Sequence, residues 1–213
     1  VIGSGAANKG ESGPRGVVSV GRWLFGGDGG CRVVGTDLTT DITVSDVVTL
    51  ASNPTRADEM AYDPASGTLL AVNNADSPPF ATLISVNKAT GQLTVGARII
   101  FDSAHSGFDA TNGAEQPIWD ARSGRFYISI PEVNCTSGPN CGGGGPDGAV
   151  ARRNTATGAG GALVPVQYCR HAGLRPGPHQ DLRVGRGVGW ASASASRDAQ
   201  RRENAARQQR GGG

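Results

Sequence analysis

The chain has 213 residues, enough for one domain or two small ones, and its 20 Lys and Arg against 18 Asp and Glu leave a net charge of only +2. That balance gives no overall reason to expect a nucleic acid or an acidic membrane as a partner. The 34 Gly and 12 Pro residues are roughly twice the usual share, which excludes a helical bundle and favours many short strands joined by turns.

Strand signals rich in Val, Ile, Thr and aromatic residues come in three groups of four along the chain. The first group covers residues 16–20, 23–27, 32–37 and 42–50. The second group covers residues 59–62, 68–73, 81–87 and 93–101. The third group covers residues 116–119, 125–130, 149–153 and 162–167.

Two kinds of turn recur in the same order within these groups. The first kind begins at Asp63 and again at Asp120, and a glycine closes it four residues later, where a positive φ is accessible at little cost. The second kind ends in Ala-Thr-Gly and occupies residues 88–91 and 154–158, with a degenerate first copy at 37–41. Each unit therefore reads as four strands with two characteristic turns.

A repeating four-stranded antiparallel unit of about 40–50 residues is typical of a β-propeller blade. We therefore predict an all-β fold, a partial β-propeller of about three blades over residues 1–168. The alternative is a β-sandwich with coincidental turns. Because propellers close with about four to eight blades, an arc of three would expose sheet faces and edges, and we expect self-association through those edges.

The last 45 residues differ from the rest in charge and in apolar content. Residues 169–213 hold nine Arg and no Lys and carry a net charge of +6, whereas residues 1–168 carry −4. Residues 185–213 contain one Trp and one Val as their only large apolar side chains, too few to offset the conformational entropy of folding. We predict a degenerate or disordered basic tail; the alternative is an arm that binds nucleic acid.

One segment of the third group resembles a known motif. Residues 115–127 read Glu-Gln-Pro-Ile-Trp-Asp-Ala-Arg-Ser-Gly-Arg-Phe-Tyr. This stretch resembles the opening motif of the senescence-marker-protein and gluconolactonase propellers, in which Glu-Gly-Pro-x-Trp-Asp leads into a Gly-Arg-Leu-Tyr strand. The wider span 23–132 is similar to bacterial proteins of that lactonase-like superfamily, notably at 22–25, 56–64 and 73–79.

The resemblance implies a site on the propeller axis. Family members hold one divalent cation there, calcium or zinc, and the Glu of the motif is a ligand, which implies Glu115 as a metal ligand. The cation polarises a lactone carbonyl while a carboxylate acts as base on water. The remaining family ligands come from later blades, which correspond here to residues 169–213 or are absent.

Further candidates follow from their places in the repeat. Asp58 and Glu59 precede the turn at Asp63 by five and four residues, close to the five by which Glu115 precedes Asp120. Their carboxylates are therefore expected to converge on the axis, with Glu59 as a second metal ligand. The amide and carboxylate side chains after the next strand are expected to line the same rim; they are Asn73, Asn74 and Asp76. Oxygen ligands of this kind suit calcium, the divalent cation we expect.

These features define two functional hypotheses. The first is a metal-dependent hydrolase of small lactones or esters, and the alternative is a non-catalytic propeller that binds a ligand or a protein through its loops. The resemblance also bears on the tail, because a family stretch of Ala-Gly-Leu-Ala-Leu-Gly-Pro is broken here by Arg and Pro at residues 172–178. That pattern is consistent with a frame-shifted or truncated end beyond about residue 169.

The cysteines and the start of the chain indicate where the protein resides. Cys135 and Cys141 flank a short loop that a disulfide would close in an exported protein, whereas no Cys or His pair has the spacing of a zinc site. No stretch approaches the roughly 18–20 apolar residues of a membrane helix. The chain begins with neither Met nor a leader, so we expect a processed periplasmic or secreted protein, or a piece of a longer one.

Overall fold

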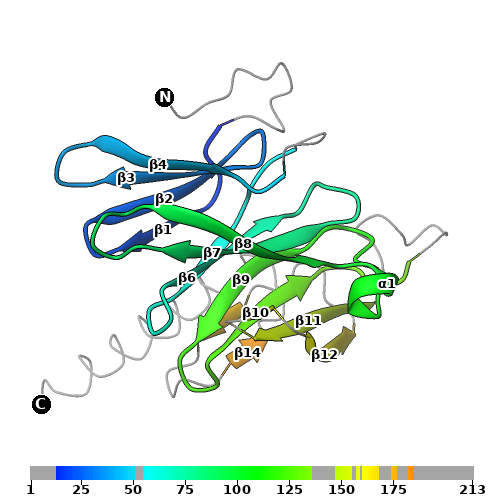
Figure 1. Cartoon of the computed structure of the whole chain (residues 1–213). Helices are drawn as coiled ribbons and strands as arrows, with labels where there is room; N and C mark the ends of the chain where they lie inside the picture. Colours follow the sequence, from blue (N-terminus) through cyan, green and yellow to red (C-terminus); the bar gives the residue numbers. More distant parts are fainter. Residues whose placement is uncertain are drawn as a thin grey trace, which may run out of the picture.

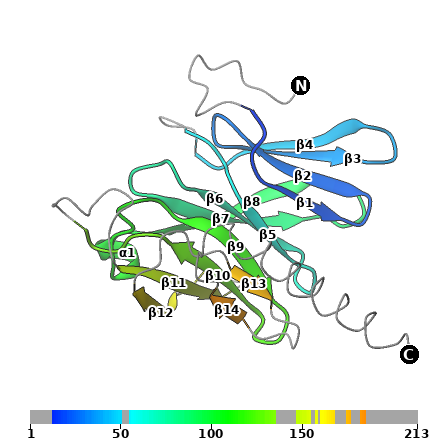
Figure 2. The same cartoon turned by 180° about the vertical axis from the view of Figure 1, so that it is seen from behind.

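The computed structural model describes residues 13–50, 55–135, 147–154, 157–158, 160–167, 174–176 and 182–184. These residues form three four-stranded antiparallel sheets, each built from consecutive strands (Figures 1 and 2). Blade 1 consists of β1 (Val17–Val20), β2 (Trp23–Asp28), β3 (Arg32–Asp37) and β4 (Ile42–Val48). Blade 2 consists of β5 (Met60–Asp63), β6 (Thr68–Asn73), β7 (Phe80–Val86) and β8 (Leu93–Ile100). Blade 3 consists of β9 (Glu115–Asp120), β10 (Arg125–Ile130), β11 (Asp147–Asn154) and β12 (Gly160–Gln167).

The arrangement of the sheets confirms the prediction of a partial β-propeller. The first strands of the blades contact one another in succession, β1 with β5 and β5 with β9, and the fourth strands β4 and β8 also meet. The blades are therefore stacked around a common axis with their first strands innermost. Every predicted strand lies within two residues of an observed one. The short helix α1 (Ser103–Ser106), between blades 2 and 3, was not predicted.

Two more short strands follow blade 3. Strands β13 (Leu174–Pro176) and β14 (Leu182–Val184) pair antiparallel, and β13 contacts β9 as β9 contacts β5 (Figure 2). Strand β13 thus occupies the place of an innermost strand of a further blade. The rest of the segment 169–213 lies outside the described residues, so its character as a basic tail stays a prediction.

The core consists of two apolar clusters, one on each side of blade 2. Strand β6 shows why, because successive side chains of a strand point to opposite faces. Leu69 packs with Phe25 of blade 1, whereas Leu70 packs with Phe126 of blade 3, and all four side chains are fully buried. Each such side chain contributes about 1.5–3 kcal/mol by leaving water, so blade 2 is the element on which its two neighbours are assembled.

The first repeated turn has the geometry expected from the sequence. Asp63 accepts hydrogen bonds from the backbone N of Ala65 at 2.8 Å and from the hydroxyl of Ser66 at 2.7 Å. Asp120 accepts from the backbone N of Ser123 at 3.0 Å. The closing glycines of the two turns have φ of +73° and +60°, a region that other residues adopt only with strain.

The second repeated turn docks each blade on the preceding one. A Cβ added to Gly91 would lie 2.7 Å from Cε3 of Trp23 in blade 1, and one added to Gly158 would lie 2.7 Å from Cγ1 of Ile99 in blade 2. Both glycines also have a positive φ. The degenerate copy has Asp41 in this place, at φ +57°. The glycine therefore recurs because two blades meet at its Cα, which the sequence alone does not show.

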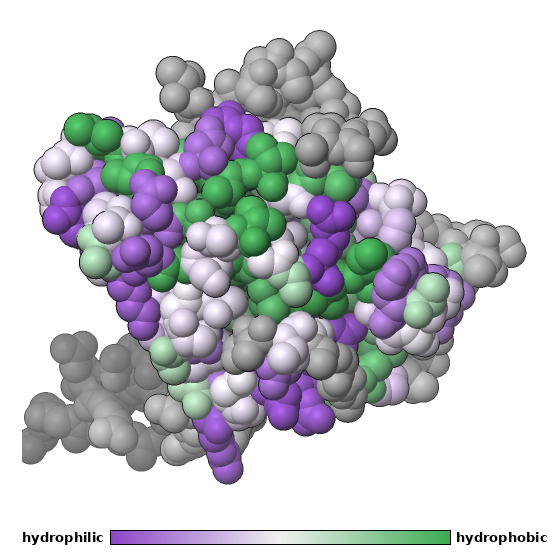
Figure 3. All heavy atoms as spheres, viewed as in Figure 1, coloured by the Kyte–Doolittle hydropathy of each residue, from purple (hydrophilic) through white to green (hydrophobic). Residues whose placement is uncertain are grey.

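Apolar side chains remain exposed mainly on the strands that have no partner on one side. They include Val17 on β1, Val48 on β4, Val95 on β8 and Val164 on β12. Hydrophobic side chains also gather across the middle of the face seen in Figure 3, where a hydrophilic strip lies among them to the right of the centre. Among the described residues, no helix has both the length and the apolar character needed to cross a membrane.

Candidate functional site

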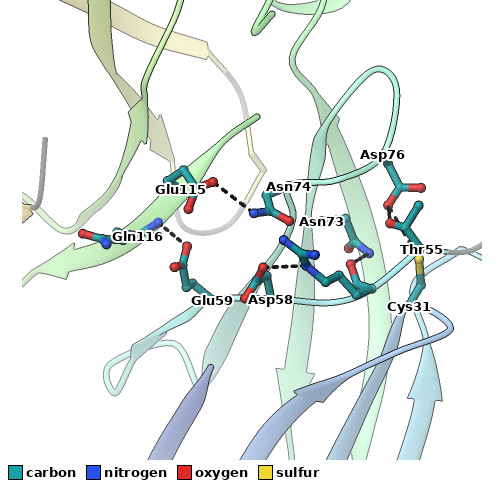
Figure 4. Close-up of polar contacts among 10 residues, drawn as sticks. Cys31, Thr55, Asp58, Glu59, Asn73, Asn74, Asp76, Glu115 and Gln116 are labelled. Atoms are coloured by element: carbon teal, nitrogen blue, oxygen red, sulfur yellow. Dashed lines mark hydrogen bonds and ion pairs between the residues drawn. The ribbon is translucent and has the colours of Figure 1, made fainter. Parts of the chain in front are cut away.

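Three polar side chains meet where blade 2 and blade 3 approach the axis (Figure 4). Glu59 immediately precedes β5, Glu115 begins β9, and Asn74 follows the end of β6. Because β5 and β9 are neighbouring inner strands, the side chains at their starts face one another. The predicted convergence of Glu59 and Glu115 is therefore present in the structure.

Hydrogen bonds hold these side chains in place. The backbone N of Gln116 donates to Oε2 of Glu59 at 2.6 Å, and Gln116 has an unusual φ of +40° that accompanies a register shift in the pairing of β9 with β10. Nδ2 of Asn74 donates to Oε1 of Glu115 at 3.0 Å. Oδ1 of Asn74 is buried and has no hydrogen-bond partner within the described part of the chain, so this amide oxygen remains available to a ligand.

The surroundings of Glu59 raise the pKa of its carboxyl group. Burial raises the pKa of Glu59 to about 7, and the negative charges of Glu115 and Asp58 add to the increase, while the N–H of Gln116 opposes it. A carboxyl group whose pKa lies near neutrality can exchange a proton at physiological pH, as a general acid or base must. The raised pKa of Glu59 is therefore compatible with a role in proton transfer.

Two other candidates, Asp58 and Asn73, have partners that stabilise the fold. Arg56 donates from Nε to Asp58 at 2.7 Å. Asn73 is fully buried, accepts from the hydroxyl of Thr49 at 3.0 Å and donates to the backbone O of Arg56 at 2.7 Å. Asn73 thus ties the end of blade 1 to the segment that leads into β5.

The third rim candidate, Asp76, lies on the blade 1 side, away from Glu115 (Figure 4). Its Oδ2 accepts from the hydroxyl of Thr55 at 2.7 Å and lies 3.7 Å from Sγ of Cys31. Cys31 is a buried free thiol whose pKa is raised to about 11, by burial and by the charge of Asp76. Of the predicted residues, the structure thus groups Glu59, Glu115 and Asn74, with Asp58 beside them.

The corresponding meeting point of blades 1 and 2 has no such pair. There Gly16 precedes β1, and its backbone N donates to the backbone O of Asp58 at 3.1 Å. A Cβ on Gly16 would lie 2.7 Å from Cα of Glu59, so the two chains meet through their backbones. Of these two blade interfaces, the one between blades 2 and 3 is where acidic side chains, rather than backbones, face each other among the described residues.

A cavity of about 760 Å³ adjoins the group, and Glu115 and Asn74 belong to its lining. Asp76 also lines it, so three of the predicted residues border one cavity. The other walls come from the rest of the β6–β7 connection, from residues 101–102 and 109–113, and from Arg56 and Cys135. The volume lies within the range of small-molecule sites, and the carboxylate of Glu115 is directly accessible from it.

The donor set suits a hard cation but provides only part of a coordination shell. Two carboxylates and one amide oxygen are the ligand types that calcium prefers. Within the described residues, however, no three or more His, Cys, Asp or Glu side chains are grouped closely enough to hold a metal ion. Further ligands would have to come from water, from substrate or from other parts of the protein.

Several residues around the site were not identified from the sequence. Gln116 and Arg56 were missed, because their contacts depend on the register shift in β9 and on the path of the segment before β5. Cys135 takes part in a disulfide bond, whereas Cys141, its predicted partner, lies outside the described residues.

No family model and no curated protein matches this chain. Solved propeller structures do match it. The Dos1 propeller superposes with a TM-score of 0.56 at 14% identity, over 79% of this chain and 39% of that one. A putative 6-phosphogluconolactonase from Bacteroides fragilis gives 0.52 at 14% identity, over 75% and 40%. The Cps50 (Swd1) β-propeller domain of Myceliophteria thermophila gives 0.53 at 9% identity, over 76% and 44%.

At these identities the similarity establishes the β-propeller fold and nothing finer. The chain spans about two fifths of the length of these solved propellers. The three have different names, one that of a lactonase and two those of other propeller proteins, so the fold does not select a function.

Proposed function

We propose that this chain belongs to a lactonase-like β-propeller and that the Glu59–Glu115 pair is the centre of a site that hydrolyses small lactones or related esters. The observation that carries the proposal is the meeting of two carboxylates on neighbouring inner strands, one of them with a pKa of about 7, beside a cavity of about 760 Å³. The match of residues 115–127 to the gluconolactonase motif supports it, as does the fold of the Bacteroides neighbour.

The proposal includes a divalent cation, calcium first. The carboxylates of Glu59 and Glu115 and Oδ1 of Asn74 would hold it, and two features of the site fit that role. The amide oxygen is buried without a hydrogen-bond partner among the described residues, and the two facing carboxylates repel each other unless a proton or a cation lies between them. When bound, the cation supplies Lewis-acid polarisation of a carbonyl.

The residues of the chain then divide the remaining tasks. Beside a bound cation Glu59 would be ionised at neutral pH and could accept a proton from a water molecule. Asn74 orients Glu115 through the hydrogen bond from Nδ2. The N–H of Gln116 fixes the rotamer of Glu59, so the position of the base depends on the backbone of β9.

We also propose that the protein is exported. The disulfide at Cys135 supports this location, because disulfides persist in the periplasm and outside the cell.

Calcium titration calorimetry on the full chain tests the metal site. We expect wild-type protein to bind calcium at pH 8, Glu115→Gln to weaken binding at least tenfold, and Asp41→Asn, which removes an exposed acid far from the axis, to leave it unchanged. Equal calcium affinity in wild type and Glu115→Gln would refute the site.

Hydrolysis of a panel of small aliphatic lactones, followed by acid release in a pH-stat, tests the reaction. We expect calcium-dependent turnover that Glu59→Gln and Glu115→Gln abolish. Calcium binding without hydrolysis of any lactone or ester would contradict the hydrolase and identify a ligand-binding propeller instead.

A further inference from the structure

A second, smaller cavity lies between blades 2 and 3, near α1 and away from the axial site. Its volume is about 280 Å³, and it shares no lining residue with the larger cavity. Its walls come from β8, α1, β11 and the second repeated turn of blade 3, and its lining includes Arg98, His105, Ser106 and Arg153. No carboxylate is among these described lining residues, and two are arginines.

The guanidinium of Arg153 is buried here with much of its hydrogen-bonding capacity unused. Arg153 is only 2% exposed. Of its five N–H donors, one from each terminal nitrogen bonds the protein: to the backbone O of Arg152 at 3.1 Å and to Oγ of Ser106 at 3.1 Å. Within the described part of the chain, Nε is buried without a partner and no carboxylate forms an ion pair with Arg153.

Aromatic rings fix the position of this charge. The Cζ atom of Arg153 lies 5.4 Å from the ring centroid of Phe101 and 5.9 Å from that of Phe108. The rings offer only part of the stabilisation that water would give, since a buried cation without an anion is costly. Burial lowers the pKa of Arg153, but a guanidinium stays charged in proteins, so the charge persists.

The repeat shows that the arginine replaces an apolar residue. The second repeated turn ends at Gly91 in blade 2 and at Gly158 in blade 3, so Val86 and Arg153, each five residues before the glycine, are equivalent. Val86 is buried in the apolar cluster between blades 1 and 2. The fold therefore has no requirement for a charge at this position, and blade 3 has acquired one.

We propose that this cavity binds a small oxyanion, a carboxylate or a phosphate group, on the guanidinium of Arg153. The planar guanidinium matches both groups in geometry. Arg98 adds a second positive charge at the cavity wall. Its guanidinium lies over the ring of Phe80, with Cζ 4.7 Å from the ring centroid, so Arg153 is the main candidate to bind the anion. A volume of 280 Å³ suits a small anion or the anionic end of a larger ligand. The proposal is independent of the axial site.

The test measures the thermal midpoint of the full chain in phosphate, acetate and chloride at matched ionic strength. We expect phosphate or acetate at ten times its dissociation constant to raise the midpoint by about 3–6 °C, with no such effect of chloride. Arg153→Met should abolish the shift. Arg152→Gln removes a positive charge from the adjacent position of β11, whose side chain points to the opposite face, and should retain it.

The relative effect of the two anions identifies the ligand group. A larger shift in phosphate assigns a phosphoryl group, and an equal or larger shift in acetate assigns a carboxylate. An equal shift in Arg153→Met and wild type would overturn the proposal. If Arg153→Met does not fold, phosphate and acetate are titrated into wild type and Arg152→Gln by calorimetry. Absence of anion binding to both proteins would then overturn the proposal.

Discussion

The interface between blades 1 and 2 and the interface between blades 2 and 3 each have an apolar centre, but the residues at their ends differ. Between blades 1 and 2 the axial end is closed by backbone contact at Gly16, and the outer end is closed by Val86. Between blades 2 and 3 the corresponding ends hold the Glu59–Glu115 pair and Arg153. The repeat thus supplies the same scaffold at both interfaces, and the two differ in the polar and charged side chains at their ends.

The largest expected effects on the free energy of unfolding come from substitutions in the two apolar clusters. Phe25 and Phe126 are each fully buried, one in each cluster. Phe25→Ala and Phe126→Ala should each lower the free energy of unfolding by about 3–5 kcal/mol, through lost burial and the cavity that remains. Urea denaturation monitored by tryptophan fluorescence measures both.

The double variant tests whether the two interfaces are independent. Because the clusters lie on opposite sides of blade 2, the two losses should add within about 0.5 kcal/mol. A coupling of more than about 1 kcal/mol would mean that blade 2 transmits strain between its faces, and the two interfaces would then have to be treated as one.

A second substitution introduces an arginine into the interface between blades 1 and 2, at the position equivalent to Arg153. Val86→Arg places a guanidinium at the position equivalent to Arg153 but against an apolar cluster, and should destabilise the protein by about 3 kcal/mol. Val95→Arg is the matched control, because Val95 is 39% exposed on the outer strand β8, and its effect should stay within about 0.5 kcal/mol. Equal effects of the two substitutions in urea denaturation would show that position 86 tolerates a charge.

The third prediction concerns the glycines of the docking turns. Gly91→Ala and Gly158→Ala should each cost about 2–3 kcal/mol, since both the positive φ and the contact with the preceding blade oppose a Cβ. Gly124→Ala has the same φ problem but nothing within 4 Å of its Cβ, so it should cost only about 1 kcal/mol. Thermal unfolding that gives one common loss would contradict the docking role.

Most of the fold and part of the candidate site could be predicted from the sequence. Alternating apolar residues and two recurring turns predicted the strands, the blades and their order, because these signals are local. The meeting of Glu59 with Glu115 was also predicted, since the repeat places both before equivalent turns. The match between Arg153 and Val86 was visible in principle, as both precede the second repeated turn.

Other features depend on contacts between distant segments. The hydrogen bond from Gln116 to Glu59 requires a register shift that no local pattern announces. The partners of Asp76 and Asn73 come from the segments that follow blade 1. They bury Asn73 away from the cavity, whereas Asp76 remains in its lining. Helix α1 has only four residues and no apolar periodicity, so nothing in the sequence distinguished it from a loop.

The smallest expected effect is a pH dependence at the axial end. Folding raises the pKa of Glu59 from 4.5 to about 7, so between these values the folded protein retains a proton that the unfolded chain has released. The free energy of unfolding contributed by this group is therefore fully present below pH 4.5 and declines as the pH rises toward 7. Solvent screens part of the effect, because Glu59 is only partly buried.

Glu59→Gln should remove this decline, so the variant becomes more stable than wild type at pH 8 and equal to it near pH 4.5. Asp41→Asn, at an exposed position, should keep the wild-type slope. Thermal midpoints from pH 4.5 to 8 measure the difference. Saturating calcium should also flatten the wild-type profile if the cation binds the ionised pair, because it then stabilises the folded state where proton release weakens it. A decline that persists unchanged in Glu59→Gln would assign it to another group and separate the axial pair from the proton chemistry proposed for it.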